Sequence, residues 1–134
     1  MSKAGEIVRD ALATLGVLDM GEAVEAADIE DGLRRLNQMM RRWEANGLSL
    51  GWNDVSSADD VLHTPPEAEE AIVTNLAVKL RSRYGVALEG DVIQMANTSY
   101  AVLLRDRHNA KPMQWREDAP MAVGRYDIYT DTWR

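Results

Sequence analysis

The stretch GLRRLNQMMRRWEANGLSLGW, residues 32–52, combines an apolar stripe with four arginines, two methionines and two tryptophans. Around it, apolar side chains recur at alternating steps of four and three residues, namely Ile29, Leu33, Leu36, Met40 and Trp43. This period is typical of an α-helix with one buried face. It predicts a helix from about Asp28, a good N-cap, to about Asn46, before Gly47. Because burial of five side chains does not offset the ordering of the backbone, this helix needs other helices to pack against.

The same period predicts three further helices. We expect the first over residues 4–15, another from about residue 65 to 84, and the last over about 90–108. Gly16 and Gly85 follow two of these segments and are typical of helix ends. The helix that begins near residue 65 has the clearest start, since Thr64 and Glu67 have capping-box spacing on either side of two prolines.

The segment between the second and third predicted helices, residues 48–63, contains glycine, serines and aspartates. Its alternation of apolar and polar residues is brief, so we expect a long loop or a short β-excursion at Leu48–Trp52. The predicted fold class is therefore all-α. We expect a four-helix domain over residues 1–109, which includes this loop, and an extended C-terminal arm over residues 110–134.

Length, composition and charge exclude several classes of protein. A chain of 134 residues predicts one domain, and the absence of cysteine excludes disulfides and thiolate metal sites. The N-terminus lacks an apolar signal-like region and no segment is apolar enough to cross a bilayer, so we expect a soluble protein without a membrane partner. The chain has 22 acidic and 15 basic residues, and the net charge of −7 has the wrong sign for neutralising DNA phosphates.

Residues with catalytic or metal-binding chemistry are few and scattered. His63 and His108 have no neighbouring residues at metal-ligand spacing, and no Gly-x-Ser-x-Gly motif or glycine-rich phosphate loop occurs. The adjacent carboxylates, such as Asp59 with Asp60, are typical of solvated loops and first helical turns. We therefore expect no catalytic residue, no metal, no cofactor and no enzyme activity.

Four arginines lie opposite the apolar stripe of the second predicted helix, namely Arg34, Arg35, Arg41 and Arg42. The plainest interpretation is a solvated face that pairs with Glu30, Asp31 and Glu44 along the helix. The arginines are also candidates for salt bridges between subunits, and Met39, beside the stripe, is a candidate for either core packing or a subunit contact. The alternative function is a small helical DNA-binding protein that uses this arginine face, although the loop after it is far longer than a helix-turn-helix turn.

Residues 110–134 have no helical period, yet they contain two tryptophans and two tyrosines out of four of each in the chain. Disordered tails are usually poor in aromatic residues. Ordering such a segment costs about 1 to 2 kcal/mol per residue, which a few rings on a monomer's own surface do not offset. A partner that pairs with the backbone and surrounds the rings would offset it. We therefore expect the arm to bind another molecule.

Two segments together resemble a known family: EIVRDALATLGV, residues 6–17, and the stretch of residues 32–52. The shared pattern is Leu-Gly at the end of a first helix, then Leu-x-x-x-Met-Met-x-x-Trp, then glycine with an aliphatic residue; here it consists of Leu15, Gly16, Leu36, Met39, Met40, Trp43, Gly47 and Leu48. It resembles the tail accessory factors of short-tailed bacteriophages. These are head-to-tail adaptor, or head-completion, proteins that bind beneath the portal and stabilise packaged DNA.

The resemblance implies a structural virion protein at the head-tail interface, present in the host cytoplasm during assembly. Its partners would be the portal protein, further copies of itself in a ring of twelve, and a downstream tail or nozzle protein. Packaged DNA would pass through the channel without sequence-specific binding. By the same resemblance, residues 110–134 are the portal-binding arm, and we infer that its anchors are Trp115, Tyr126, Ile128, Tyr129 and Trp133.

Overall fold

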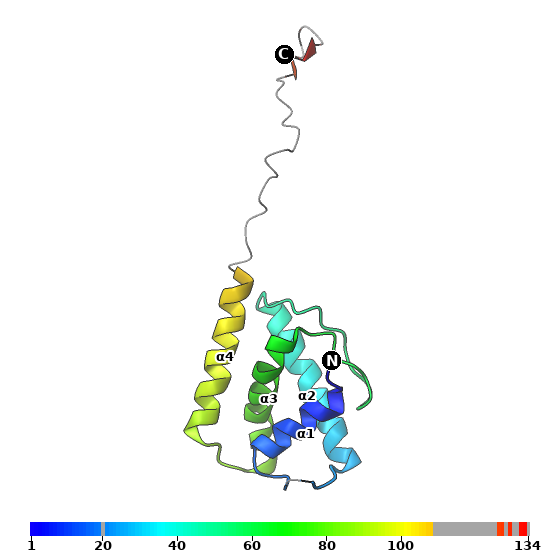
Figure 1. The fold of residues 1–134 in the computed structure, drawn as a ribbon, viewed down its shortest axis with the longest axis vertical. Coiled ribbons are helices and arrows are strands. Elements are labelled where there is room, and N and C mark those ends of the chain that lie inside the picture. Colours follow the sequence, from blue (N-terminus) through cyan, green and yellow to red (C-terminus); the bar gives the residue numbers. More distant parts are fainter. Residues whose placement is uncertain (20, 109–125, 128, 130–131, 134) are drawn as a thin grey trace.

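The computed structural model describes residues 1–19, 21–108, 126–127, 129 and 132–133. Within these residues the order of elements is α1 (Ala4–Thr14), α2 (Ala26–Ala45), a 3₁₀ turn η1 (Pro66–Ala68), α3 (Glu69–Tyr84), α4 (Gly90–His108), β1 (Tyr126–Asp127) and β2 (Thr132–Trp133) (Figure 1). The expected all-α class with four helices is confirmed. The division into residues 1–109 and 110–134 stays a prediction, because residues 109–125 lie outside the described ranges. None of the described helices meets the length and hydropathy needed to span a membrane.

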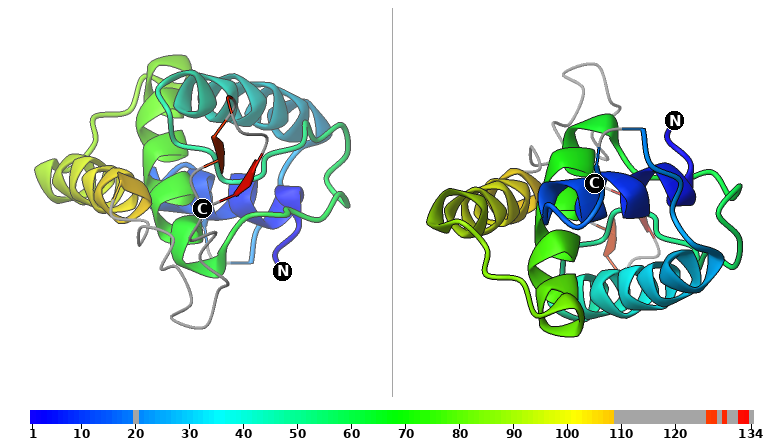
Figure 2. Two further views of the ribbon diagram at one scale, coloured as in Figure 1. Left: turned by 90° about the horizontal axis from the view of Figure 1, so that it is seen from above. Right: turned by 90° about the horizontal axis from the view of Figure 1, so that it is seen from below.

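Helix α3 is the centre of the arrangement. It contacts α1 and α2 on one side and α4 on the other, and α1 and α2 also contact each other. Figure 2 shows α4 set apart from α1 and α2, with α3 between them. Since α4 packs mainly on α3, the part of α4 whose burial is described, residues 90–107, buries only Ala96 and Leu103, whereas α2 buries seven residues.

The apolar stripe of α2 forms the core, as its period predicts. Leu33, Leu36, Met40 and Trp43 are buried, and Ile29 is partly buried against the same cluster. Helix α1 approaches α2 closely at Gly32, where an added Cβ would lie 2.4 Å from Cγ1 of Val8. The glycine is therefore needed for this contact, because any larger residue would push the two helices apart.

The predicted start of the second helix at Asp28 is wrong. Helix α2 begins at Ala26, and Glu25 occupies the N-cap position without a side-chain cap. Asp28 lies within the first turn, where its carboxylate accepts a hydrogen bond of 2.7 Å from the hydroxyl of Tyr84 on α3. The Asp28 carboxylate thus joins α2 to α3 and does not cap α2, although aspartate is a preferred N-cap residue.

The capping box predicted at Thr64 and Glu67 is also wrong. Residues Pro66–Ala68 form a 3₁₀ turn, and α3 begins only at Glu69. The Thr64 hydroxyl is buried without a hydrogen-bond partner among the described residues, so it caps nothing. The predicted end is confirmed, since Gly85 adopts a left-handed conformation with φ of 63° directly after α3.

The long connection between α2 and α3 is a loop, not a β-excursion, because residues 48–55 form no strand. Its alternate apolar side chains are nevertheless buried: Leu48, Leu50 and Trp52 are at most 8% exposed. Asn37 of α2 fixes the loop, because its amide nitrogen donates to the Val55 carbonyl at 2.8 Å and its amide oxygen accepts from the Val55 N–H at 3.0 Å. The loop therefore belongs to the core of the helical body.

Candidate assembly surfaces

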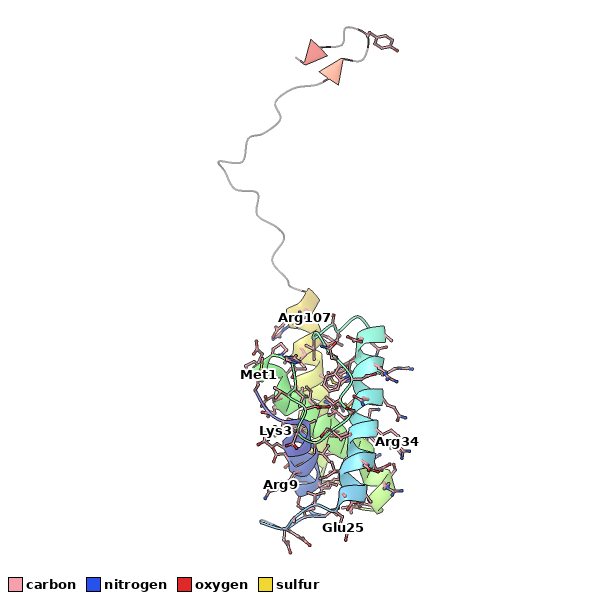
Figure 3. The ribbon with its side chains drawn as sticks, turned by 90° about the vertical axis from the view of Figure 1, so that its right-hand side faces the viewer. Met1, Lys3, Arg9, Glu25, Arg34 and Arg107 are labelled. Atoms are coloured by element: carbon pink, nitrogen blue, oxygen red, sulfur yellow. The ribbon has the colours of Figure 1, made fainter. Side chains whose placement is uncertain are left out.

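The outer surface of α2 presents a compact cluster of positive charge. Gln38 is exposed at its centre, and the residues three and four positions before and after it are all arginines: Arg34, Arg35, Arg41 and Arg42. Residues at these spacings are neighbours on a helix surface. We call these five residues the arginine face. Figure 3 shows Arg34 pointing away from the helices.

Two of the four arginines have an acidic partner within the chain. Arg34 pairs with Asp31, one turn earlier, as the solvated-face interpretation predicts. Arg41 pairs with Asp54 of the loop, with 3.1 Å between Nε and Oδ1. The hydrogen bond from Arg41 holds the pKa of Asp54 below its usual value, so this carboxylate stays ionised at neutral pH.

These pairs leave much of the arginine face available for contacts. The side chains of Arg34 and Arg41 are 67% and 64% exposed, so both guanidinium groups remain open to solvent. Arg35 and Arg42 have no ion pair with any described residue, and the predicted pairing with Glu30 and Glu44 is not seen. Exposed ion pairs of this kind contribute at most about 1 kcal/mol.

Asp31 connects the edge of this face to α3. Its carboxylate is only 6% exposed and contacts Arg34 and also Arg83, whose Nε lies 3.0 Å from Oδ2. Both arginine side chains are more than half exposed. The two cations therefore cover the carboxylate and hold the N-terminal part of α2 against the C-terminal part of α3.

The structure decides between the two roles considered for Met39. Its side chain is 1% exposed and belongs to the core cluster. It lies three residues after Leu36 and four before Trp43, so it faces the interior with them. Core packing is confirmed, and a subunit contact through Met39 is wrong, because its own chain already covers it.

A second surface lies between α3 and α4, where a hollow of about 570 Å³ opens to solvent. Four carboxylates line it: Glu67, Glu70, Asp91 and Asp106. Among the described residues, no lysine or arginine lines it. Apolar side chains also contribute, since Met95 and Val102 are 48% and 38% exposed. We call this surface the acidic hollow.

The acidic hollow is not apparent from the sequence because its residues come from two helices. Glu67 lies in the 3₁₀ turn η1 and Glu70 in the first turn of α3, whereas Asp91, Met95 and Val102 belong to α4. Carboxylates in first helical turns usually complement the helix dipole, which explains their presence without any partner. The sequence pattern that could have indicated the hollow is the stripe of residues 91, 95, 98, 102 and 106 along α4. This stripe combines exposed apolar and acidic side chains.

The predicted arm anchors are only partly described. Tyr126 and Trp133 belong to strands that pair antiparallel with each other, and their backbones form one register pair. Tyr129, between the strands, is 92% exposed. Trp115 and Ile128 lie outside the described residues. The short strand pair was not predicted, because strands of two residues leave almost no periodic signal.

The residues considered for catalysis or metal binding do not form a cluster in the described helical body. His63 is exposed, and His108 ends α4. Nowhere in the described part of the chain do three or more histidine, aspartate or glutamate side chains form a group that could hold a metal ion.

Comparison with known proteins identifies the family. The family model described as P22 tail accessory factor matches residues 1–134. No curated protein matches the chain. The family match covers the C-terminal segment as well as the helices, and so extends beyond the segments that carry the resemblance in the sequence. The chain therefore belongs to the P22 tail accessory factor family of short-tailed phages, with a structural role in the virion.

Proposed function

We propose that this protein is a head-to-tail adaptor that binds the portal as a ring and extends the DNA channel. The observation that carries the proposal is the contrast between its two parts. The helical body buries a continuous core from Ala4 to Leu103, whereas Tyr129, in the C-terminal strand pair, is 92% exposed. A body with its own core, followed by a segment with an exposed tyrosine, is what an adaptor with a separate gripping arm requires.

The arm of residues 110–134 is the proposed portal-binding segment. Its aromatic rings bury large areas only when a partner surrounds them, and its backbone gains hydrogen bonds when a partner strand or helix end pairs with it. The paired strands β1 and β2 would give the end of the arm a fixed shape before binding. Trp115, Tyr126, Ile128, Tyr129 and Trp133 are the proposed anchors.

The proposed partners follow from this position. The protein binds the portal protein above, further copies of itself in a ring of twelve, and a tail or nozzle protein below. Packaged DNA passes through the channel without sequence-specific contacts, and the net charge of −7 favours a channel wall that does not hold the duplex. The protein acts at the head-tail interface of the virion, after assembly in the host cytoplasm, and performs no catalytic step.

The arginine face does not favour the alternative of a DNA-binding protein. Two of its four arginines already pair with Asp31 and Asp54, which lowers the positive charge available to phosphates. The 20-residue helix is also followed by a long loop instead of the short turn that a helix-turn-helix requires. A salt-dependent shift of duplex DNA by the purified protein would reverse this ranking.

Electron microscopy of the protein mixed with the portal of its own phage tests the proposal. We expect a ring of added density beneath the portal. A chain that lacks residues 110–134 is the matched variant, and it is expected to leave the portal bare while its helical circular dichroism stays nearly unchanged. A portal without added density in the presence of the full chain would contradict the proposal. A collapse of the helical signal in the shortened chain would show that the arm belongs to the core.

A further inference from the structure

The arginine face and the acidic hollow lie on different sides of the same molecule. The arginine face is on the outer surface of α2, and the acidic hollow is bounded by α4, on the other side of α3 (Figure 2). We infer that neighbouring copies meet head to tail, with the arginine face of one copy seated in the acidic hollow of the next. This inference rests on the proposed ring, because it names the surfaces through which the ring closes.

The two surfaces are complementary in charge. The arginine face has four guanidinium groups, and the described lining of the hollow has four carboxylates, of which Asp106 lies 3.8 Å from Nε of Arg105 on the same helix. Arginine binds carboxylates through two parallel hydrogen bonds, which fixes orientation as well as charge. Arg35 and Arg42 have no ion pair within the described chain, so they need not leave a partner when a second copy binds.

The hollow also offers apolar area that its own chain leaves uncovered. Met95 and Val102 remain exposed because α4 has its main packing partner on only one side. The aliphatic part of an arginine side chain can cover such residues while its guanidinium group reaches a nearby carboxylate. The two surfaces thus match in their apolar as well as in their charged side chains.

Two different surfaces on one molecule determine the kind of assembly. A contact between unlike surfaces leaves one of each free, so it propagates from copy to copy and closes into a ring when the rotation allows. A two-fold contact of the arginine face with itself would place like charges together, which is unfavourable. Exposed ion pairs are individually weak, so this contact would be maintained where the portal already holds the copies side by side.

Cysteine cross-linking on the portal tests this inference, because the chain has no cysteine of its own. Gln38→Cys places one thiol at the centre of the arginine face, and Thr98→Cys places another in the hollow. The double variant is bound to portal whose thiols have been blocked, treated with a short bis-maleimide, and separated on a denaturing gel. A chain with one cysteine cannot be linked beyond a dimer, so each single variant is a control.

We expect a ladder of trimers and larger species from the double variant and nothing beyond a dimer from either single variant, as a head-to-tail contact requires. A matched double variant that pairs Gln38→Cys with Ala87→Cys, at an exposed position outside the hollow, is expected to give no ladder. If the double variant forms a ring on the portal but gives no ladder, the inferred contact is wrong and the adaptor proposal stands. If the unmodified chain forms no ring on the portal, both are wrong.

Discussion

At Gly32 the packing of two helices depends on a single missing methyl group. An alanine there would place its Cβ 2.4 Å from Cγ1 of Val8, a buried residue that has no room to move. Alanine normally stabilises a helix interior by about 1 kcal/mol relative to glycine, so the intrinsic preference and the packing oppose each other. Packing decides the outcome, because overfilling a close-packed core costs more.

We therefore expect Gly32→Ala to lower the free energy of unfolding by about 1 to 3 kcal/mol. Thermal and urea unfolding, followed by circular dichroism, measure this change. Gly90→Ala is the matched control, since nothing lies within 4 Å of its added Cβ and stability should stay the same or rise slightly. Equal effects of the two substitutions would show that α1 and α2 do not approach each other as described.

Tyr84 is expected to make stability dependent on alkaline pH. Its burial, together with the hydrogen bond to Asp28, raises its pKa to about 12 from the ordinary value of 10. The folded state therefore keeps a proton that the unfolded state loses, so this stabilising contribution is complete below pH 10 and disappears between pH 10 and 12. Urea midpoints measured across this range should fall less steeply for Tyr84→Phe than for the natural chain. Parallel curves would contradict the shift.

Two tryptophans should respond in opposite ways to truncation. Trp133→Ala, in the proposed arm, is expected to weaken attachment to the portal with little effect on the melting temperature. Trp52→Ala removes a side chain that is 8% exposed in the core and should lower the free energy of unfolding by about 3 to 5 kcal/mol. Portal co-sedimentation and thermal melting of both variants separate the two roles. A large drop in the melting temperature of Trp133→Ala would place this residue in the core.

At the scale of elements, α4 is the least embedded of the four helices. Asn75 of α3 donates a hydrogen bond of 3.0 Å to the Ala96 carbonyl, and Trp43 of α2 contacts Tyr100 with ring centroids 5.0 Å apart. Apart from the contact with Trp43, α4 packs mainly against α3. Most of its described side chains are at least partly exposed. An element with few buried apolar contacts opens locally before the whole molecule unfolds.

Amide hydrogen exchange should therefore be faster in α4 than in the centre of α2 and α3. Mass spectrometry of the free protein under native conditions, with peptides that cover each helix, measures the difference. Binding to the portal is expected to slow exchange in α4, because the acidic hollow is then covered by a neighbouring copy. Equal protection of α3 and α4 in the free protein would contradict this ranking.

The helices themselves could be predicted from the sequence, but two of their starting residues could not. The period of three and four residues identified all four helices and the buried face of α2, because each amphipathic pattern reflects its own packing. The helix starts at Asp28 and Thr64 were predicted wrongly, since Tyr84 binds the first side chain and a 3₁₀ turn replaces the second cap. The alternation in residues 48–55 reflected burial against the core without a partner strand.

The candidate surfaces were predicted less completely than the fold. The arginine face was visible because its members belong to one helix, with fixed spacing around Gln38. The acidic hollow was missed because it joins Glu67 and Asp91, which only tertiary structure brings to one surface. The helical period indicates which face of a helix is buried but not how deeply, so it leaves core packing and a subunit contact open for Met39, which lies in the core.

At the scale of the whole molecule, the free protein should be a monomer or only weakly associated. Its charged surfaces offer exposed ion pairs, which contribute little in solution and are weakened by salt. In the proposed ring, alignment of several copies on the portal would raise their effective concentration and make the same contacts sufficient. Analytical ultracentrifugation of the free protein at physiological salt measures this. A stable dodecamer without portal would contradict the role of the portal as template.

The antiparallel pairing of α3 and α4 (Figure 1) has a mechanical consequence. Helix α4 is the described helix before the proposed arm, so if the arm grips a portal, tension would enter the body at the C-terminal end of α4. A pull along the axis of α4 loads the contact with α3 in shear, so that resistance is shared along the whole helix pair. A sideways pull would instead peel α4 away turn by turn. The joint would thus withstand a pull along α4 better than a sideways one.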